Sequence, residues 1–252
     1  ESGIKWPLAA EATVTLRHGE VALNDLKVKL PEVQLEGWGR LRPGQPETFE
    51  LNLASRFLDL GPLLSAEGSQ WHRLLLPSQL KGKVRLEVDR LLWRGQTLER
   101  LELSAALDQC DLRIDHLAVA FPGGGSLISQ GTWATSLSSP EFVGSARLET
   151  PNLRAQLEAL GFEPRGIAAD RLRRFTIAAA LSARPDRLEI SDLHLELDRM
   201  NWAGGFATAL RERPGLGLRL VGDLADLDAY AAVWRRLAPT FLSNVDANLE
   251  LG

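Results

Sequence analysis

The residues that could carry out chemistry are few and lie far apart in the sequence. The four histidines, His18, His72, His116 and His194, have no partner at the spacing of a metal-binding pair. The single cysteine, Cys110, cannot form an internal disulfide. The chain has no phosphate-binding loop, no GxSxG nucleophile elbow and no HExxH helix. The sequence therefore predicts no enzyme activity, no metal site and no cofactor.

Other polar clusters have structural explanations that outweigh functional ones. The glycines at 123–125 follow Pro122 between two expected strands, which favours a hairpin turn over a phosphate cradle. Asp59, Asp226 and Asp228 stand at expected helix starts, where carboxylates complement the helix dipole. Four arginines near a repeat junction are expected on a solvated face, with a lipid-headgroup clamp as the alternative. They are Arg165, Arg171, Arg173 and Arg174.

Composition places the chain among folded globular proteins. Its 252 residues are 44% hydrophobic and 25% charged, and 29 basic against 33 acidic side chains give a formal net charge of −4. No excess of Lys and Arg is available to neutralise a phosphate backbone, so we expect no nucleic-acid partner. The longest candidate membrane span, 58–80, contains Asp59, Glu67, His72 and Arg73, and lacks the about 20 mostly apolar residues of a bilayer crossing.

Both ends of the chain suggest a larger protein. The sequence opens at Glu1 without an initiator methionine, and it closes at 245–251 in the middle of an alternating strand pattern. We expect the chain to be an internal fragment, with any signal peptide or membrane anchor outside it.

Alternation of apolar and polar residues is the strongest signal in the sequence. Val84, Leu86 and Val88 alternate with charged residues, and similar rows run over 101–107 and 175–181. Side chains of a strand point to opposite faces in turn, so each such strand has one apolar face and one largely solvated face. This pattern favours an antiparallel sheet over the doubly buried strands of a parallel one.

A longer pattern occurs three times, at 21–30, 112–121 and 188–197, and a two-residue polar break interrupts each copy. Because the break shifts the phase by one residue, it would turn the apolar residues to the other face unless the strand bulges or bends there. We expect a bent strand at each break. The breaks are Asn24-Asp25, Asp115-His116 and Ser191-Asp192.

Each copy stands in the same context, which defines a unit of four strands and a short helix. Short polar links such as 17–20 and 184–186 suit hairpins, and helix-like pieces at 58–64, 152–160 and 226–234 close the copies. Asn152 and Asp226 suit helix N-caps and Gly161 a C-cap, and 71–76 is a further helix candidate. The sequence predicts three β-repeats, at 8–66, 81–161 and 172–238. The second has an extra strand at 84–93, and 239–252 would begin a further repeat.

An apolar sheet face must be covered, and the few short helices cannot cover more than a dozen strands. A second sheet would give a sealed β-sandwich, whereas a curled sheet would form a trough for an apolar ligand. The internal repetition and the expected truncation favour the trough. The predicted fold is therefore mainly β: an elongated, repetitive antiparallel sheet curled into a U-shaped groove, with short helices closing each repeat.

The sequence resembles the AsmA family of bacterial envelope proteins over nearly its whole length. The resemblance lies in the pattern of strands and closing segments and not in invariant catalytic residues. The resemblance rests on the strand pattern, on the closing segments 58–64 and 224–230, and on the stretch 82–103. It implies a periplasmic β-groove, anchored to the inner membrane by a helix absent here, that carries phospholipid towards the outer membrane. The resemblance also implies a periplasmic or outer-membrane protein partner. The chain departs from this pattern in lacking the anchor.

If the resemblance holds, the apolar row of each strand lines the groove and exchanges water for acyl chain at about 0.8 kcal/mol per buried methylene. The alternative is an assembly module of the bacterial envelope with the same rows as a sealed core and no ligand. The predicted lining residues are Val84, Leu86, Val88, Leu101, Leu103, Leu112, Ile114, Leu117, Val119, Phe121, Phe142, Leu148, Phe175, Ile177, Leu188, Ile190, Leu193, Leu195 and Leu197.

Overall fold

The protein is represented by a computed structural model that divides into two compact units, Glu1–Ala120 and Phe121–Gly252. The boundary falls inside the second predicted repeat. The residues described are 9–30, 33–44, 47–59, 61, 80–93, 95–108, 111–134, 140–159, 161–209, 215–222 and 246–251.

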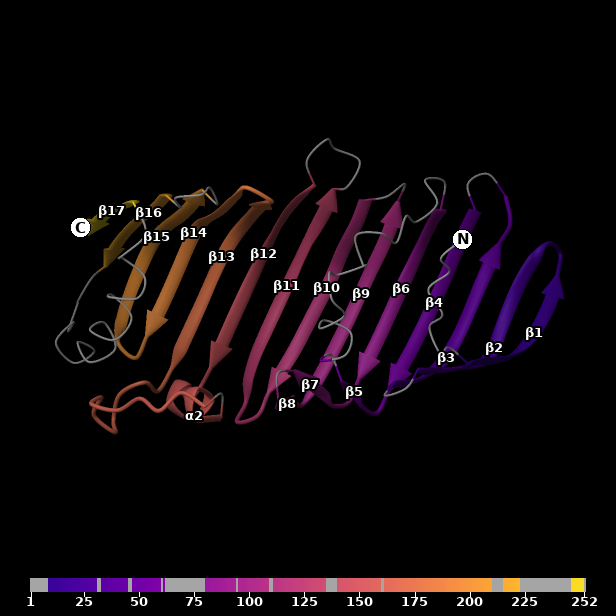
Figure 1. The fold of residues 1–252 in the computed structure, drawn as a ribbon, viewed down its shortest axis with the longest axis horizontal. Coiled ribbons are helices and arrows are strands. Elements are labelled where there is room, and N and C mark those ends of the chain that lie inside the picture. Colours follow the sequence, from indigo (N-terminus) through magenta and orange to yellow (C-terminus); the bar gives the residue numbers. More distant parts are fainter. Residues whose placement is uncertain are drawn as a thin grey trace. The chain divides into compact units, whose positions relative to one another are not determined.

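Unit 1 is a sheet with the strand order β1-β2-β3-β4-β6-β9-β10 (Figure 1). All neighbours pair antiparallel except β4 and β6, which are parallel. The strands are β1 (Ala9–Arg17), β2 (Glu20–Leu30), β3 (Val33–Arg42), β4 (Glu47–Ser55), β6 (Leu80–Val88), β9 (Arg100–Asp108) and β10 (Asp111–Phe121).

Unit 2 continues the chain with the strand order β11-β12-β13-β14-β15-β16-β17. Here too the pairs are antiparallel except the last, β16 with β17. The elements are β11 (Gly125–Ala134), β12 (Glu141–Thr150), helix α2 (Leu153–Ala159), β13 (Phe175–Arg184), β14 (Arg187–Leu197), β15 (Met200–Ala209), β16 (Gly215–Gly222) and β17 (Asp246–Leu251).

The mainly β fold is as predicted, but the expectation of a purely antiparallel sheet is wrong. Parallel neighbours need a crossover connection, because a tight turn can only reverse the chain. Both crossovers follow the fourth strand of a predicted repeat, after β4 and after β16. Alternation of residue types is the same in parallel and antiparallel one-sided strands, so the pattern alone could not distinguish them.

The predicted turns are confirmed in position. His18 and Gly19 connect β1 to β2 with positive φ angles of 47° and 79°, the conformation that a two-residue hairpin turn requires. At Gly123 and Gly124 φ is 83° and 85°, and the Gly124 amide donates to the Phe121 carbonyl at 3.3 Å. Pro122, Gly123 and Gly124 therefore form a turn and Gly125 begins β11, which agrees with the preferred explanation from the sequence.

The strand breaks are β-bulges, one of the two outcomes, bulge or bend, that the phase shift allows. The register shifts between Leu23 and Leu26 in β2, between Ile114 and His116 in β10, and between Ile190 and Leu193 in β14. At two of the bulges an aspartate, Asp25 or Asp192, takes a left-handed φ of 52° or 49°. A short polar side chain tolerates this conformation best among residues with a Cβ, which explains the residue type at the break.

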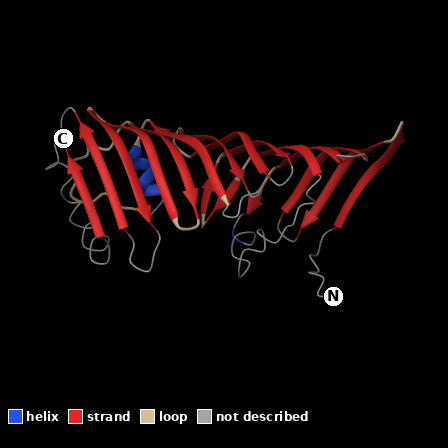
Figure 2. Cartoon of the chain, turned by 90° about the horizontal axis from the view of Figure 1, so that it is seen from above, coloured by secondary structure: helices blue, strands red, loops and turns tan. Residues whose placement is uncertain are grey.

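Helix α2 has the predicted caps. The Ala155 amide donates to Oδ1 of Asn152 at 3.2 Å, and after the helix Gly161 has φ of 80° while the Phe162 amide donates to the Leu157 carbonyl at 2.8 Å. The helix lies beside the strand ends of unit 2 (Figures 1 and 2).

The segment after α2 packs on the same margin of unit 2. Ile167, Leu172 and Met200 form a buried cluster there. The carboxylate of Asp198 accepts hydrogen bonds from the amides of Leu172 and Arg173 at 2.9 and 2.7 Å. These bonds hold the segment against the β14–β15 turn, so one end of this sheet has a cover of its own.

One margin of unit 1 is covered by a small three-stranded sheet of β5 (Leu58–Asp59), β7 (Leu91–Trp93) and β8 (Gln96–Leu98). This corrects two expectations. In the predicted helix at 58–64, Leu58 and Asp59 instead form strand β5, and the Leu58 amide donates to the Arg90 carbonyl; Gly61 is helical, and 60 and 62–64 lie outside the described residues. The predicted extra strand at 84–93 ends at Val88, because the Asp89 amide turns to the Ser55 carbonyl. One leucine of each strand of this small sheet is buried: Leu58, Leu91 and Leu98.

Three predicted segments lie outside the described residues. They are the helix candidate at 71–76, the closing piece at 226–234 with its cap Asp226, and Cys110.

Candidate functional site: the apolar face

In unit 1 the register brings all the predicted lining residues of β6, β9 and β10 onto one face. Directly opposite residues of neighbouring strands point to the same side of a sheet. The partners are Val84 with Ala105, Leu86 with Leu103, Val88 with Leu101, Leu107 with Leu112, Ala105 with Ile114, Leu103 with Leu117, and Leu101 with Val119. Phe121, the last residue of β10 and the first of unit 2, continues the alternation of that strand.

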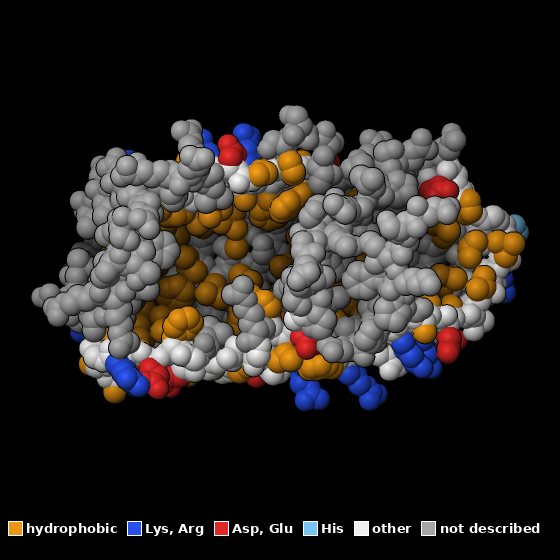
Figure 3. All heavy atoms as spheres, in the orientation of Figure 1, with side chains coloured by type: hydrophobic (Ala, Val, Ile, Leu, Met, Phe, Trp, Pro, Cys, Tyr) orange, Lys and Arg blue, Asp and Glu red, His pale blue; other side chains and the backbone are white. Residues whose placement is uncertain are grey.

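Unit 2 has an equivalent face over β12, β13 and β14. The partners are Phe142 with Ala183, Leu148 with Ile177, Phe175 with Leu197, Ile177 with Leu195, Ala183 with Leu188, and Leu181 with Ile190. Figure 3 shows hydrophobic side chains gathered over these strands of unit 2, and separately at the β1–β2 end of unit 1.

The bulges keep these rows on one face. In β14, Ile190 lies opposite Phe206 and Leu193 lies opposite Gly204, two positions further along β15. The extra residue of the bulge therefore restores the phase that the polar break would have reversed. Leu193 has only 7% of its surface exposed, which shows that the residue directly after the bulge points into the apolar face.

Most of the lining residues keep some contact with solvent. Of the nineteen, only Val88, Val119 and Leu193 are buried, and Leu112 is 39% exposed. By contrast, Leu91 in β7 of the small sheet is 2% exposed. Burial is uneven over the described residues: both margins and some positions of the apolar face, among them Val88 at 1% and Leu107 at 6%, are closely packed, whereas most of the predicted lining is only partly buried.

Several apolar residues on the same faces were left out of the predicted lining. They lie on β3, β4, β9, β11, β13, β15 and β16, and the same alternation could have identified them. They include Leu41, Phe49, Leu51, Leu53, Leu107, Leu127, Trp133, Leu181, Trp202, Phe206 and Leu218. The Trp133 and Phe142 rings are cross-strand partners with centroids 6.3 Å apart.

The opposite face of each unit is polar. In unit 2, Arg184 donates to Glu141 at 3.0 Å, and this hydrogen bond, with a second from the Ser182 hydroxyl, lowers the pKa of the Glu141 carboxyl. In unit 1, the Arg42 side chain donates to Glu20 at 2.6 Å and lowers the pKa of that carboxyl. Each sheet therefore has one apolar and one charged side.

The polar residues singled out from the sequence form no metal-binding cluster in the part of the chain that the structure describes. No group of three or more His, Cys, Asp or Glu side chains there could hold a metal ion. His116 and His194 are exposed strand residues, as predicted. In the arginine cluster, Arg174 pairs with Glu196 at 3.6 Å and Arg165 with Glu163. These ion pairs are typical of a solvated face. No described helix is both long and apolar enough to span a bilayer.

Comparison with known proteins finds no match: no protein-family model, no curated protein and no solved structure is similar to this chain.

Proposed function

We propose that this chain is a segment of a periplasmic lipid-transfer conduit, in which the apolar faces of its units hold phospholipid acyl chains on their way between the inner and outer membranes. The full-length protein would be anchored to the inner membrane by a helix outside this chain, and a periplasmic or outer-membrane protein would receive the lipid. The observation that carries the proposal is the apolar face of each unit, continuous from strand to strand and incompletely buried.

An acyl chain would bind such a face by exchanging water for methylene contacts, at about 0.8 kcal/mol per buried methylene. The described lining is made of aliphatic and aromatic side chains, and the ion pairs lie on the other face. With no directional bonds, the face would accept chains of different length and unsaturation. This tolerance suits transport better than storage of one defined ligand.

We also infer that the two units contain copies of one β-repeat, curled into a continuous groove in the full protein. The supporting features recur at matching places. Gly37 lies opposite Leu26 after the β2 bulge, and Gly204 lies opposite Leu193 after the β14 bulge. A Cβ built on either glycine would stand 1.9 Å from a backbone carbonyl oxygen of the next strand, Asn52 in one copy and Arg219 in the other.

The experiment is native mass spectrometry with organic extraction on the chain purified from bacteria, asking whether phospholipid co-purifies. Leu112→Asp places a charge on the apolar face of unit 1 at a residue already 39% exposed. Ile128→Asp is the matched control, because Ile128 is 46% exposed and lies on the opposite face of unit 2, one position from Leu127.

We expect bound phospholipid in the wild-type chain and in Ile128→Asp, and its loss in Leu112→Asp. Circular dichroism would establish that both variants remain folded. A folded wild-type chain that carries no lipid and takes up none from added phospholipid vesicles would refute the conduit. The sealed-core assembly module would then be the better explanation.

A further inference from the structure

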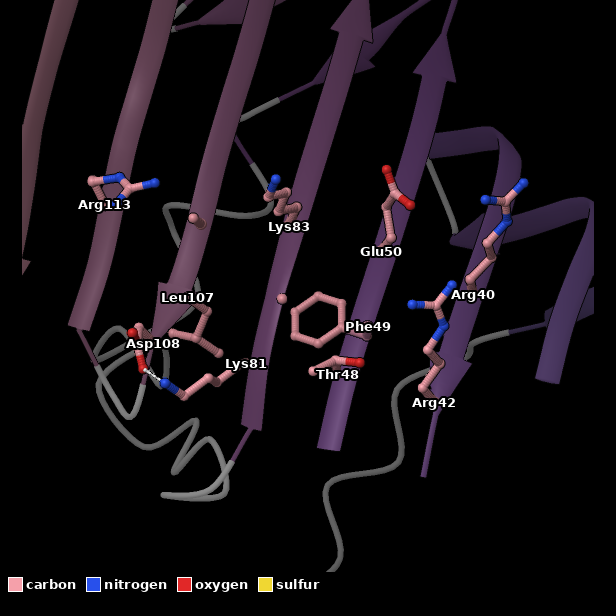
Figure 4. A pocket seen from close by; sticks show the side chains of 12 residues that line it. Arg40, Arg42, Thr48, Phe49, Glu50, Lys81, Lys83, Leu107, Asp108 and Arg113 are labelled. Atoms are coloured by element: carbon pink, nitrogen blue, oxygen red, sulfur yellow. Dashed lines mark ion pairs between the residues drawn. The ribbon is translucent and has the colours of Figure 1, made fainter. Parts of the chain in front are cut away.

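The charged face of unit 1 contains a pocket of about 470 Å³ across β3, β4, β6, β9 and β10. Its lining carries five cationic side chains, Arg40, Arg42, Lys81, Lys83 and Arg113 (Figure 4). Only two carboxylates, Glu50 and Asp108, line it with them. The whole chain has a net charge of −4, so this concentration of positive charge runs against the overall composition.

The carboxylates around the pocket are largely engaged with cations other than Lys83. Asp108 pairs with Lys81 at 2.8 Å, and Glu20, beside the pocket, pairs with Arg42 at 2.6 Å. Glu50 is the cross-strand partner of Lys83, but no ion pair joins the two. Within the described part of the chain, the Lys83 ammonium has no carboxylate partner.

The register places a small residue between two of the cations. Ala106 of β9 lies directly opposite Lys83 of β6 on one side and Arg113 of β10 on the other. Neighbouring strands are about 4.8 Å apart, so Lys83 and Arg113 start about 10 Å from each other with only a methyl group between them. Both side chains are long enough to reach an anion placed above Ala106.

Arg113 is already oriented by its own strand. Its Nε donates to Asp115 at 2.7 Å, two residues further along β10. This bond leaves the two terminal nitrogens for another acceptor, and the planar guanidinium fork suits two oxygens of one phosphate group. Figure 4 shows Arg113 and Lys83 on the two sides of this space.

We propose that the charged face of unit 1 binds a phosphate group above Ala106, held by Lys83 and Arg113. The phosphate would come from a small phosphate-bearing anion or from a lipid headgroup. The site lies on the face opposite the apolar lining, so it does not depend on the acyl-chain proposal.

The test is calorimetric titration of the chain with inorganic phosphate at low salt, together with sedimentation binding to vesicles of phosphatidylglycerol and, as a neutral reference, phosphatidylcholine. Lys83→Gln and Arg113→Gln each remove one charge from the site. Ala106→Leu fills the space above residue 106, between Lys83 and Arg113, without changing the charge of the site. Arg147→Gln is the matched control, because Arg147 of unit 2 is similarly exposed and bonds Glu149 two residues along its strand.

We expect Lys83→Gln and Arg113→Gln each to weaken binding about tenfold, as the loss of one charge-assisted hydrogen bond would. Ala106→Leu should weaken binding by a similar factor because its side chain occupies the space of the anion, and Arg147→Gln should bind as the wild type. Binding of inorganic phosphate identifies a small anion. Binding only of phosphatidylglycerol vesicles, with the same loss in the variants, identifies a headgroup. The proposal is overturned if neither probe binds, or if Ala106→Leu and Lys83→Gln bind as tightly as the wild type.

Discussion

The same Leu→Ala substitution should have very different costs at two places in unit 1. Leu91, in β7 of the small β5-β7-β8 sheet, is 2% exposed, whereas Leu112 is 39% exposed on the apolar face. Leu→Ala removes three carbons, or about 2.4 kcal/mol of transfer free energy when the side chain is fully buried. With the cavity left behind, we expect Leu91→Ala to lower the free energy of unfolding by about 3–5 kcal/mol.

Leu112→Ala removes atoms that already meet water and leaves no enclosed cavity. We therefore expect it to lower the free energy of unfolding by only about 1 kcal/mol. The measurement is urea denaturation of both variants followed by circular dichroism, with equal m-values as the condition for comparing midpoints. If Leu112→Ala costs as much as Leu91→Ala, Leu112 is enclosed, and the argument for an open apolar face fails.

Three further experiments test other parts of the structure. Gly204→Ala should destabilise unit 2 by more than about 2 kcal/mol, because its Cβ would stand 1.9 Å from a carbonyl oxygen, whereas Gly217→Ala, with its nearest atom at 3.9 Å, should be tolerated in the same denaturation assay. Asn152→Ala should cost about 1 kcal/mol by loss of the α2 cap, and amide hydrogen exchange in the first turn should rise; unchanged exchange would contradict the capping role. The Arg184 hydrogen bond lowers the pKa of Glu141, so its stabilisation should be present at neutral pH and disappear as the pH falls below the ordinary glutamate range of about 4.3. The stability difference between wild type and Glu141→Gln should therefore shrink in acid, and a difference that is constant from pH 7 to pH 3 would contradict this assignment.

Much of the fold could be predicted from the sequence because one-sided strands carry a local signal. The alternation of Val84, Leu86 and Val88 is visible without any tertiary information, and so are the turn glycines and the cap at Asn152. The bulges were predictable too, since a phase shift within one strand has few structural solutions. Parallel pairing of β4 with β6 was not, because it depends on the path of a connection and not on the strand residues.

The small sheet at the strand ends of unit 1 was the least predictable part, because its pairing also depends on residues far apart in the sequence. Segment 58–64 has the apolar residues of a short helix, yet Leu58 pairs with Leu91 as a strand. That pairing joins residues more than thirty positions apart, so the strand or helix propensity of the segment alone does not indicate it. The cation pocket was missed because Lys83, Ala106 and Arg113 come together only through the register of three strands.

The bulges connect local sequence to the proposed function. Without the extra residue in β14, Leu193, Leu195 and Leu197 would face the charged side, and the apolar row would be broken halfway along the strand. With it, the row extends over the whole strand and from strand to strand. Seven strands about 4.8 Å apart give a unit about 30 Å of such surface, close to the hydrocarbon thickness of a bilayer and so about twice the length of one acyl chain. A face longer than its ligand has no single bound position, so an acyl chain could move from one strand to the next while it keeps contact with apolar side chains, which is the physical requirement of a conduit.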